Sequence, residues 1–309
     1  MFPGCASLHR TEFYVSTQTA PASKISSHQP VPGPTDTVAF GHVRVSRLMV
    51  GHNPVCGNSH ASDAMNAEMS AYFTAENVVA MYRHAESLGI KTVVVRGDYT
   101  RLGYLELYRR AGGTMNVICQ TASEMHDIFR NIRVCAAAGA DAIYHHGTQT
   151  DRFWMEGKID KTADYLKCMR DCGVAVGLCS HKPEIIDYAQ QKQWDVDFLM
   201  CCFYDPGKGR IRQSAIVNRA ASADYGGEIY DDADRDAMCR TIAVASKPVL
   251  AFKILAATRK CATQEDVRAA YRFAYEHIRP TDAVAVGFFP KRLDQIALGI
   301  QYARECATV

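Results

Sequence analysis

The sequence contains no long hydrophobic run and no excess of charge of either sign. None of its apolar runs approaches the roughly 18–20 residues that a helix needs to cross a bilayer, so we expect no membrane-spanning segment. The formal net charge is only +2 over 309 residues, which gives no field that would attract nucleic acid or an anionic membrane. We therefore predict a cytoplasmic protein whose partner is a small-molecule substrate, and we leave a homo-oligomer open.

Zinc-binding pairs of cysteines are also missing. The chain has 12 cysteines but no Cys-x-x-Cys pairs at a separation that suits a structural zinc ion. Several stand inside apolar runs, where cysteine acts as a small hydrophobic residue: Cys119, Cys179, Cys201 and Cys202. This placement predicts buried, reduced thiols in a reducing compartment. A nucleophile at Cys201 or Cys202 is the alternative, but apolar surroundings raise a thiol pKa and reduce its reactivity.

Acidic residues are scarce at the start of the chain, where Glu12 and Asp36 stand among many Ser, Thr and Pro. The segment 1–37 has no apolar h-region, which argues against a secretory signal peptide. A transit peptide is an alternative, because such peptides are poor in acids. We predict that residues 1–37 form a flexible or wrapping extension, followed by one catalytic domain over residues 38–309.

From Val43 onward, short apolar runs alternate with helical patterns. Eight apolar runs occur: Leu48–Gly51, Thr92–Arg96, Asn116–Gln120, Ala142–His146, Ala175–Cys179, Phe198–Phe203, Val249–Ile254 and Ala283–Phe288. Strands that are apolar throughout are buried on both faces, and helical connections place neighbouring strands parallel. Eight such units predict an α/β protein with a (β/α)8 TIM barrel, closed below by a short hairpin at 39–45. A doubly wound open sheet is the alternative, but its Gly-x-Gly-x-x-Gly turn is absent.

Polar and titratable residues gather at the carboxyl ends of these runs, which is where barrels carry their active sites. The ends hold His52-Asn53, Arg96-Gly-Asp98-Tyr99, Gln120-Thr121, His145-His146-Gly147, Ser180-His181, Tyr204-Asp205, Lys253 and Phe289-Pro290-Lys291. The polar segment 207–234 is too long for a simple connection, so we predict that it folds over the site as a lid.

Seven segments between residues 40 and 305 resemble, in order, those of the aldo-keto reductase superfamily: VRVSRLMVGHNP, LGIKTVVVRGDY, ADAIYHHG, VGLCSHKPEIIDYA, DFLMCCFYDP, KPVLAFKILAA and AVAVGFFPKRLDQI. The resemblance implies a (β/α)8 barrel and catalytic roles for Tyr99 and His146. The family's Asp and Lys positions hold Val94 and Gln120 here. Because a tyrosine with a pKa of about 10 donates a proton poorly without the Lys–Asp pair, the resemblance implies a divergent member with weak or absent NADPH binding.

Catalytic roles are predicted for His146, Lys253, Tyr99 and Asp98. Side chains alternate along a strand, so we expect His146 to face the pocket and His145 to pack against a helix. Lys253 interrupts the apolar run VLAFKILAA, and a buried lysine is costly unless it is paired or functional. Desolvation would lower its pKa and make it a base or a Schiff-base nucleophile. An ion pair with Asp98 or Asp205 is the alternative.

Residues that bind the substrate are predicted at the other strand ends: His52, Asn53, Arg96, Gln120, His181, Tyr204 and Asp205. Lys291 and Arg292 follow the last strand at the start of a helix, where barrels often bind phosphate; a solvated helix start is the alternative. If His52, His146 and His181 converge, they suit zinc or another divalent ion. Otherwise they form hydrogen bonds in a polar pocket.

Three functions remain open on the sequence. The favoured one is an enzyme that uses acid–base chemistry without redox, a lyase, isomerase or hydrolase for a small polyhydroxylated or carbonyl compound, with a metal ion as an optional aid. The alternatives are an NADPH-dependent carbonyl reductase that uses Tyr99 and His146, and a non-catalytic binding barrel. The many polar residues at the carboxyl ends of the strands argue against a non-catalytic binding barrel. Fold analogy cannot distinguish the acid–base enzyme from the reductase.

Overall fold

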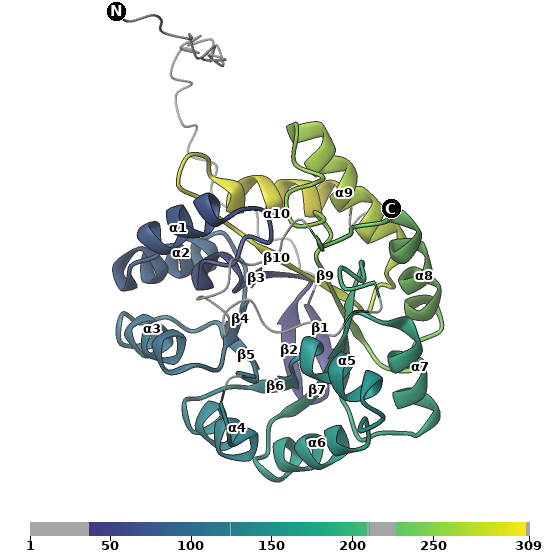
Figure 1. The fold of residues 1–309 in the computed structure, drawn as a ribbon. Helices are drawn as coiled ribbons and strands as arrows, with labels where there is room; N and C mark the ends of the chain where they lie inside the picture. The colour runs from purple at the N-terminus through teal and green to yellow at the C-terminus, as the bar shows by residue number, and fades with distance from the viewer. Residues whose placement is uncertain (1–36, 124, 209, 211–226, 307–309) are drawn as a thin grey trace, which may run out of the picture. The chain divides into compact units, whose positions relative to one another are not determined.

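The computed structural model describes residues 37–123, 125–208, 210 and 227–306. Eight parallel strands close into a barrel that helices surround (Figure 1). The barrel strands are β3 (Leu48–Gly51), β4 (Thr92–Arg96), β5 (Asn116–Gln120), β6 (Ala142–His145), β7 (Ala175–Ser180), β8 (Phe198–Cys202), β9 (Val249–Phe252) and β10 (Ala283–Gly287). Each pairs with the next along the chain, and β10 pairs with β3. The predicted barrel is confirmed, and each strand begins where its apolar run begins.

Helices connect the strands and cover the outside of the barrel (Figure 1). Their bounds are η1 (Pro54–Cys56), α1 (Asp63–Tyr72), α2 (Ala75–Ser87), α3 (Tyr99–Arg110), α4 (Ile128–Ala137), α5 (Gly147–Met155), α6 (Lys161–Asp171), α7 (Pro183–Gln191), α8 (Asp232–Ala243), α9 (Gln264–His277) and α10 (Gln295–Cys306). Several begin at a capping side chain, as at α2, where Thr74 accepts the backbone N–H of Asn77. None of the helices in the described parts of the chain has the length and apolar character that a bilayer crossing requires.

An antiparallel hairpin, β1 (Thr37–Phe40) and β2 (Val43–Ser46), precedes the first barrel strand. Its apolar side chains pack in one cluster with residues inside the barrel. The ring of Phe40 stacks on that of Phe198, with 4.7 Å between the centroids. Because Phe198 is the first residue of β8, the hairpin closes the end of the barrel where the strands start, as predicted (Figure 1). The end where the strands finish is therefore the one open to a ligand.

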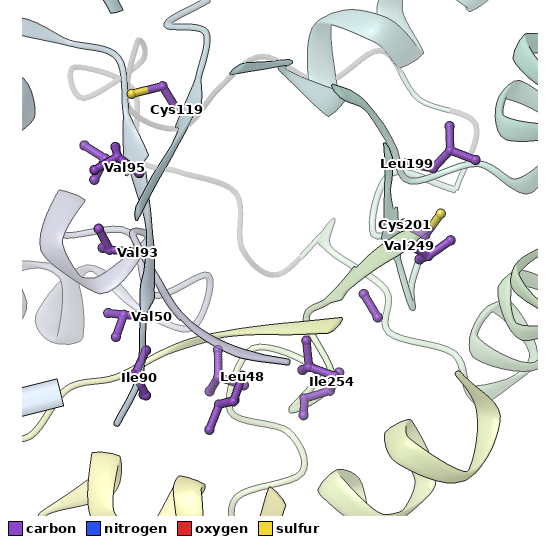
Figure 2. Packing of buried hydrophobic residues seen from close by; sticks show 14 of the residues in the cluster. Leu48, Val50, Ile90, Val93, Val95, Cys119, Leu199, Cys201, Val249 and Ile254 are labelled. Atoms are coloured by element: carbon purple, nitrogen blue, oxygen red, sulfur yellow. The ribbon is translucent and has the colours of Figure 1, made fainter. Parts of the chain in front are cut away.

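The barrel wall separates two packed layers. On β4, Val93 and Val95 belong to the layer between strands and helices, whereas Val94 belongs to the layer inside the barrel. Figure 2 shows members of the outer layer, including Val93, Val95 and Leu199, around the wall. Because side chains alternate along a strand, the last inward-facing residues of the strands converge over the mouth of the barrel.

Two predicted segments lie wholly or mostly outside the described residues. These segments are the N-terminal extension, of which residues 1–36 are not described, and the lid, of which 209 and 211–226 are not. The predicted end of the lid is corrected, because α8 already begins at Asp232 with Asp231 as its N-cap. The capping carboxylate accepts a backbone N–H of the first helical turn and starts the helix before residue 234.

Candidate functional site

A cavity of about 490 Å³ lies at the carboxyl ends of the barrel strands. Of the predicted site residues, six line it: His52, Asn53, Gln120, His146, His181 and Lys253. Among the described residues that line the cavity, none is an aspartate or a glutamate, and Lys253 is the one lysine or arginine. The cavity wall therefore offers several hydrogen-bonding groups and one lysine side chain.

His181 and Asp151 form a hydrogen-bonded pair at this mouth. The Nδ1 atom of His181 lies 2.7 Å from Oδ2 of Asp151. The other carboxylate oxygen accepts the hydroxyl of Ser180 at 2.7 Å and the backbone N–H of His181 at 3.3 Å. Because a carboxylate only accepts hydrogen bonds, Nδ1 carries the hydrogen. Nε2 is then the ring nitrogen left for chemistry in the cavity.

The adjacent histidines face opposite sides of the barrel wall. His145 ends β6, lies 2.8 Å from the hydroxyl of Thr150, and stacks on Tyr165. His146 lines the cavity, and its buried Nδ1 has no hydrogen-bond partner among the described residues. Burial lowers the pKa of His145 to about 3, and burial together with the charge of Arg96 holds the pKa of His146 well below its usual range. Both rings are therefore neutral near pH 7.

Gln120 and Tyr144 meet on the cavity wall, where the Tyr144 hydroxyl donates to Oε1 of Gln120 at 3.0 Å. Val94 also lines the cavity. The cavity thus has an amide and an apolar side chain at the two positions where the resemblance places a Lys–Asp pair. Cys179 lines it too, but burial raises the pKa of this thiol well above its usual range. The thiol stays protonated at neutral pH and is a poor nucleophile.

Lys253 lies just beyond β9 and not inside the strand, because the strand ends at Phe252. Its φ of 60° falls in the left-handed region. This conformation costs a residue with a side chain about 1–3 kcal/mol, so the surrounding structure must hold Lys253 in it. Lys253 lines the cavity close to His52. Burial lowers the pKa of His52 to about 3, and the positive charges of Arg96, Arg101 and Lys253 act in the same direction.

Two of the predicted catalytic residues lie outside the cavity. Asp98 caps α3 by accepting the backbone N–H of Arg101, and its other oxygen accepts Nη1 of Arg96 at 2.8 Å. Tyr99 is the first residue of α3, and 62% of its surface is exposed. The helix start explains both positions, because a capping carboxylate points at the backbone and the next residue turns outward. Arg96 is buried beside Asp98 and is not among the residues that line the cavity, but its charge lowers the pKa of both His52 and His146.

Two predicted substrate contacts also have other partners. Tyr204 is buried, packs against Tyr230, and is not among the residues that line the cavity. Asp205 accepts Nζ of Lys182 at 2.6 Å and the backbone N–H of Gly207 at 3.2 Å. Asp205 therefore closes the turn after β8.

The predicted phosphate site does not face the cavity either. Nζ of Lys291 and Nη2 of Arg292 lie 2.9 and 2.7 Å from the same carboxylate oxygen of Glu68 on α1. Neither cation is among the residues that line the cavity. Their side chains join the loop after β10 to α1, and the shared carboxylate already offsets part of their charge.

The predicted histidine metal site is not formed by the described residues. His52, His146 and His181 all line the cavity, but no group of three or more His, Cys, Asp or Glu side chains in the described parts of the chain could hold a metal ion. The order of the strands gives the reason, since β3 stands across the barrel from β6 and β7. His181 also has its Nδ1 engaged by Asp151.

Two parts of the site could not be predicted from the residues that directly follow the apolar runs. One is Asp151, which lies inside α5; its spacing of four residues from Gly147 was the available clue, because such residues share a helix face. The other is the loop after η1, where Asn58, Ser59 and His60 line the cavity. Asn58 is only 9% exposed, and its Oδ1 has no hydrogen-bond partner among the described residues.

No protein-family model and no curated protein matches the chain. Among solved structures, a protein described as a 2,5-diketo-D-gluconic acid reductase B is 11% identical, with a TM-score of 0.52 over 88% of this chain and 90% of its own. The glycerol dehydrogenase of Gluconobacter oxydans, an aldo-keto reductase, is 12% identical, with a TM-score of 0.50 over 88% and 90%.

A third similar solved structure is that of an enzyme with a different activity. A truncated form of 3-deoxy-D-arabino-heptulosonate 7-phosphate synthase from Thermotoga maritima is 13% identical, with a TM-score of 0.50 over 87% of this chain and 89% of its own. At such identities the likeness shows the fold alone. The (β/α)8 barrel is confirmed. Because the barrels of both reductases and a synthase are similar to it, the fold does not determine the chemistry.

Proposed function

We propose that the protein is an enzyme that moves a proton on a small carbonyl or polyhydroxylated compound without redox, as a lyase, isomerase or hydrolase does. One observation carries this proposal: His181 lines the cavity, and Asp151 holds its Nδ1 at 2.7 Å. A carboxylate that fixes the tautomer of a histidine is a recurrent way to provide a general base.

In this proposal His181 abstracts a proton from the carbon next to a substrate carbonyl. The electron pair of the C–H bond moves into a C=C bond, and the carbonyl electrons move onto oxygen to give an enolate. The ammonium of Lys253 stabilises that negative charge, and the Tyr144–Gln120 pair and His52 offer hydrogen bonds beside it. In a hydroxy ketone, transfer of the hydroxyl proton to the enolate oxygen and return of the abstracted proton to the former carbonyl carbon give the isomer, as an isomerase does. If the carbonyl re-forms and a group on the next carbon leaves with its bonding electron pair, the enzyme is a lyase.

A simple exchange experiment tests this chemistry before the substrate is known. A panel of hydroxy ketones and 2-oxo acids is incubated with the protein in deuterium oxide, without any nucleotide, and loss of the α-proton signals is followed by NMR. We expect exchange above the buffer rate for at least one compound, and a rate about 10²–10⁴-fold lower for His181→Gln. No exchange on any compound, or an equal rate for His181→Gln, would refute the proposal.

An NADPH-dependent carbonyl reductase remains the competing function, because the fold is shared with such enzymes. Val94 and Gln120 in the cavity and the outward position of Tyr99 argue against it. We therefore expect weak or absent NADPH binding in a fluorescence titration. Saturable micromolar binding, followed by oxidation of the nucleotide when a carbonyl compound is added, would replace the proposed function with the reductase.

A further inference from the structure

The cavity continues beyond the barrel mouth into an annex between the segment after β9 and the helices α9 and α10. Six side chains define this annex: Leu255, Val267, Tyr271, Phe288, Leu298 and Tyr302. They come from the loop after β9, from α9, from the end of β10 and from α10. Lys253 stands at the junction, since it lines the same cavity two residues before Leu255.

The walls of the annex are mostly apolar, and their amide side chains already have partners. The hydroxyl of Tyr302 donates to Oε1 of Gln264 at 3.1 Å, and Oε1 of Gln295 accepts the backbone N–H of Phe289 at 2.8 Å. From Ile254 onward, the described residues that line the cavity include no charged side chain. Such a wall favours an apolar group and gives no cation to hold a phosphate.

The mouth of the cavity has the opposite character. It contains Lys253, and no carboxylate stands among its described lining residues. The two carboxylates bonded to its lining histidines, Asp151 and Glu228, are engaged by His181 and His60. Asn58 adds a buried amide oxygen that has no hydrogen-bond partner in the described part of the chain, which favours a ligand that donates a hydrogen bond there. One cavity therefore joins an end suited to a polar anion with an end suited to hydrocarbon.

We propose that the substrate is amphiphilic, with an anionic carbonyl head at the mouth beside Lys253 and an apolar alkyl or aromatic body in the annex. This inference rests on the proposed function and narrows its substrate class. A cavity of about 490 Å³ falls in the range that holds a molecule of drug size. Each methylene buried in the annex stabilises the complex by about 0.8 kcal/mol, which is roughly a fourfold gain in affinity.

The first experiment measures binding of straight-chain 2-oxo acids of increasing length by calorimetry. We expect affinity to rise about fourfold per added methylene until the annex is filled. Methyl ketones of equal length should bind at least about tenfold more weakly, because they lack the charge that Lys253 attracts. In Lys253→Met the difference between acid and ketone should disappear. Equal affinity at all chain lengths in the unchanged protein would overturn the proposal.

Two variants test whether the hydrocarbon chain binds in the annex. Val267→Trp should fill it and abolish the gain with chain length, whereas the matched control Val244→Trp, at a residue 75% exposed directly after α8, should leave the gain intact. Leu298→Ala should enlarge the annex and move the best chain length up by one or two carbons. Melting temperatures show that each variant is folded. A gain that persists in Val267→Trp and an optimum unchanged in Leu298→Ala would place the chain elsewhere and refute the inference.

Binding and chemistry can fail separately. His181→Gln should keep the dependence on chain length and lose proton exchange. Chain-length dependence without exchange in the unchanged protein would refute the proposed function and leave the annex as a binding site. Proton exchange without chain-length dependence would support the proposed function and refute the annex as the site of the apolar body. Competition by NADPH that is lost in Val267→Trp would make the annex a nucleotide site and overturn the inference.

Discussion

The geometry around Asp151 explains how His181 differs from His52 and His146, which line the same cavity. Asp151 receives three hydrogen bonds, from the Ser180 hydroxyl and from the backbone and ring N–H groups of His181. Each bond fixes the carboxylate, and the carboxylate in turn fixes the ring. His52 and His146 have no carboxylate among the hydrogen bonds described for them, and burial keeps their rings neutral. His60 also lines the cavity and its Nδ1 lies 2.9 Å from a carboxylate oxygen of Glu228, but its Nε2 lies 3.3 Å from Nδ2 of Asn58. None of the hydrogen bonds of the described residues engages Nε2 of His181, so His181 is the histidine best placed to accept a proton.

Replacement of Asp151 tests this role at the residue scale. Asp151→Asn keeps the size of the side chain but lets the amide donate to Nδ1, which puts the hydrogen on Nε2. We expect proton exchange to fall by about 10²–10⁴-fold, with a smaller change in substrate affinity. Asp164→Asn on α6, at an exposed carboxylate, is the matched control and should retain full activity. An active Asp151→Asn protein would show that the pair is structural.

Neutral buried histidines also make stability depend on pH. The pKa of His52 and of His145 is about 3 in the folded chain, against about 6.5 in the unfolded chain. The unfolded chain therefore takes up protons first, so stability is complete above about pH 6.5 and is lost as the pH falls toward 3.

His145→Phe should reduce this pH dependence. In urea titrations, the slope of the unfolding free energy against pH should fall by about 1.4 kcal/mol per pH unit within that window, the value for one proton. The same change at the exposed His126 should leave the slope unaltered. Parallel curves for His145→Phe and the unchanged protein would mean that His145 titrates normally.

At the scale of elements, α5 brings Asp151 to the mouth, and its first residue allows a close approach. A Cβ at Gly147 would stand 2.8 Å from Sγ of Cys179 and 3.2 Å from Cε1 of His181. The helix could then no longer lie against the end of β7 without a shift. This packing ties the position of Asp151 to that of the ring it holds.

Gly147→Ala should therefore destabilise the protein by about 1–3 kcal/mol and lower proton exchange. Adding Cys179→Ala removes the sulfur contact and should restore part of the melting temperature. Gly103→Ala within α3 is the control, because a Cβ there meets nothing within 4 Å and alanine favours a helix by about 1 kcal/mol. If Gly147→Ala melts like the control, the contact does not position α5.

The same scale shows which elements the sequence could predict. Every barrel strand starts where its apolar run starts, because buried parallel strands need continuous apolar residues. The ends were less certain: Lys253 was assigned to a strand, yet its left-handed backbone ends β9 one residue earlier. A local turn of this kind depends on packing that a hydrophobic pattern does not encode.

Across the whole molecule, the barrel separates stability from function. The hairpin and Phe40 close one end, and the cavity opens at the other. Phe40→Ala removes a buried aromatic pair, so it should lower the unfolding free energy by about 3–5 kcal/mol and leave exchange per folded molecule unchanged. Chemical denaturation and the exchange assay together check this. A loss of exchange in the folded variant would mean that the two ends are coupled.

The candidate site was predictable only in part, for the same architectural reason. Residues that directly follow strands, such as His52, His146 and His181, reached the cavity because strand parity and barrel closure determine their direction. Tyr99 did not, because a helix begins at that residue and turns it outward. Asp151 and Asn58 lie on a helix and a loop, whose placement follows from tertiary packing and not from the strand pattern.

The central claim is that Asp151 prepares His181 as a base, and ¹⁵N NMR of the histidine side chains tests it most directly. At about pH 8, where imidazole is ordinarily neutral, His181 should show a protonated Nδ1 and an unprotonated Nε2, and Asp151→Asn should reverse this tautomer. The spectrum of His145 should be unaffected by that substitution. An Nε2–H tautomer of His181 in the unchanged protein, or no difference in Asp151→Asn, would contradict the account.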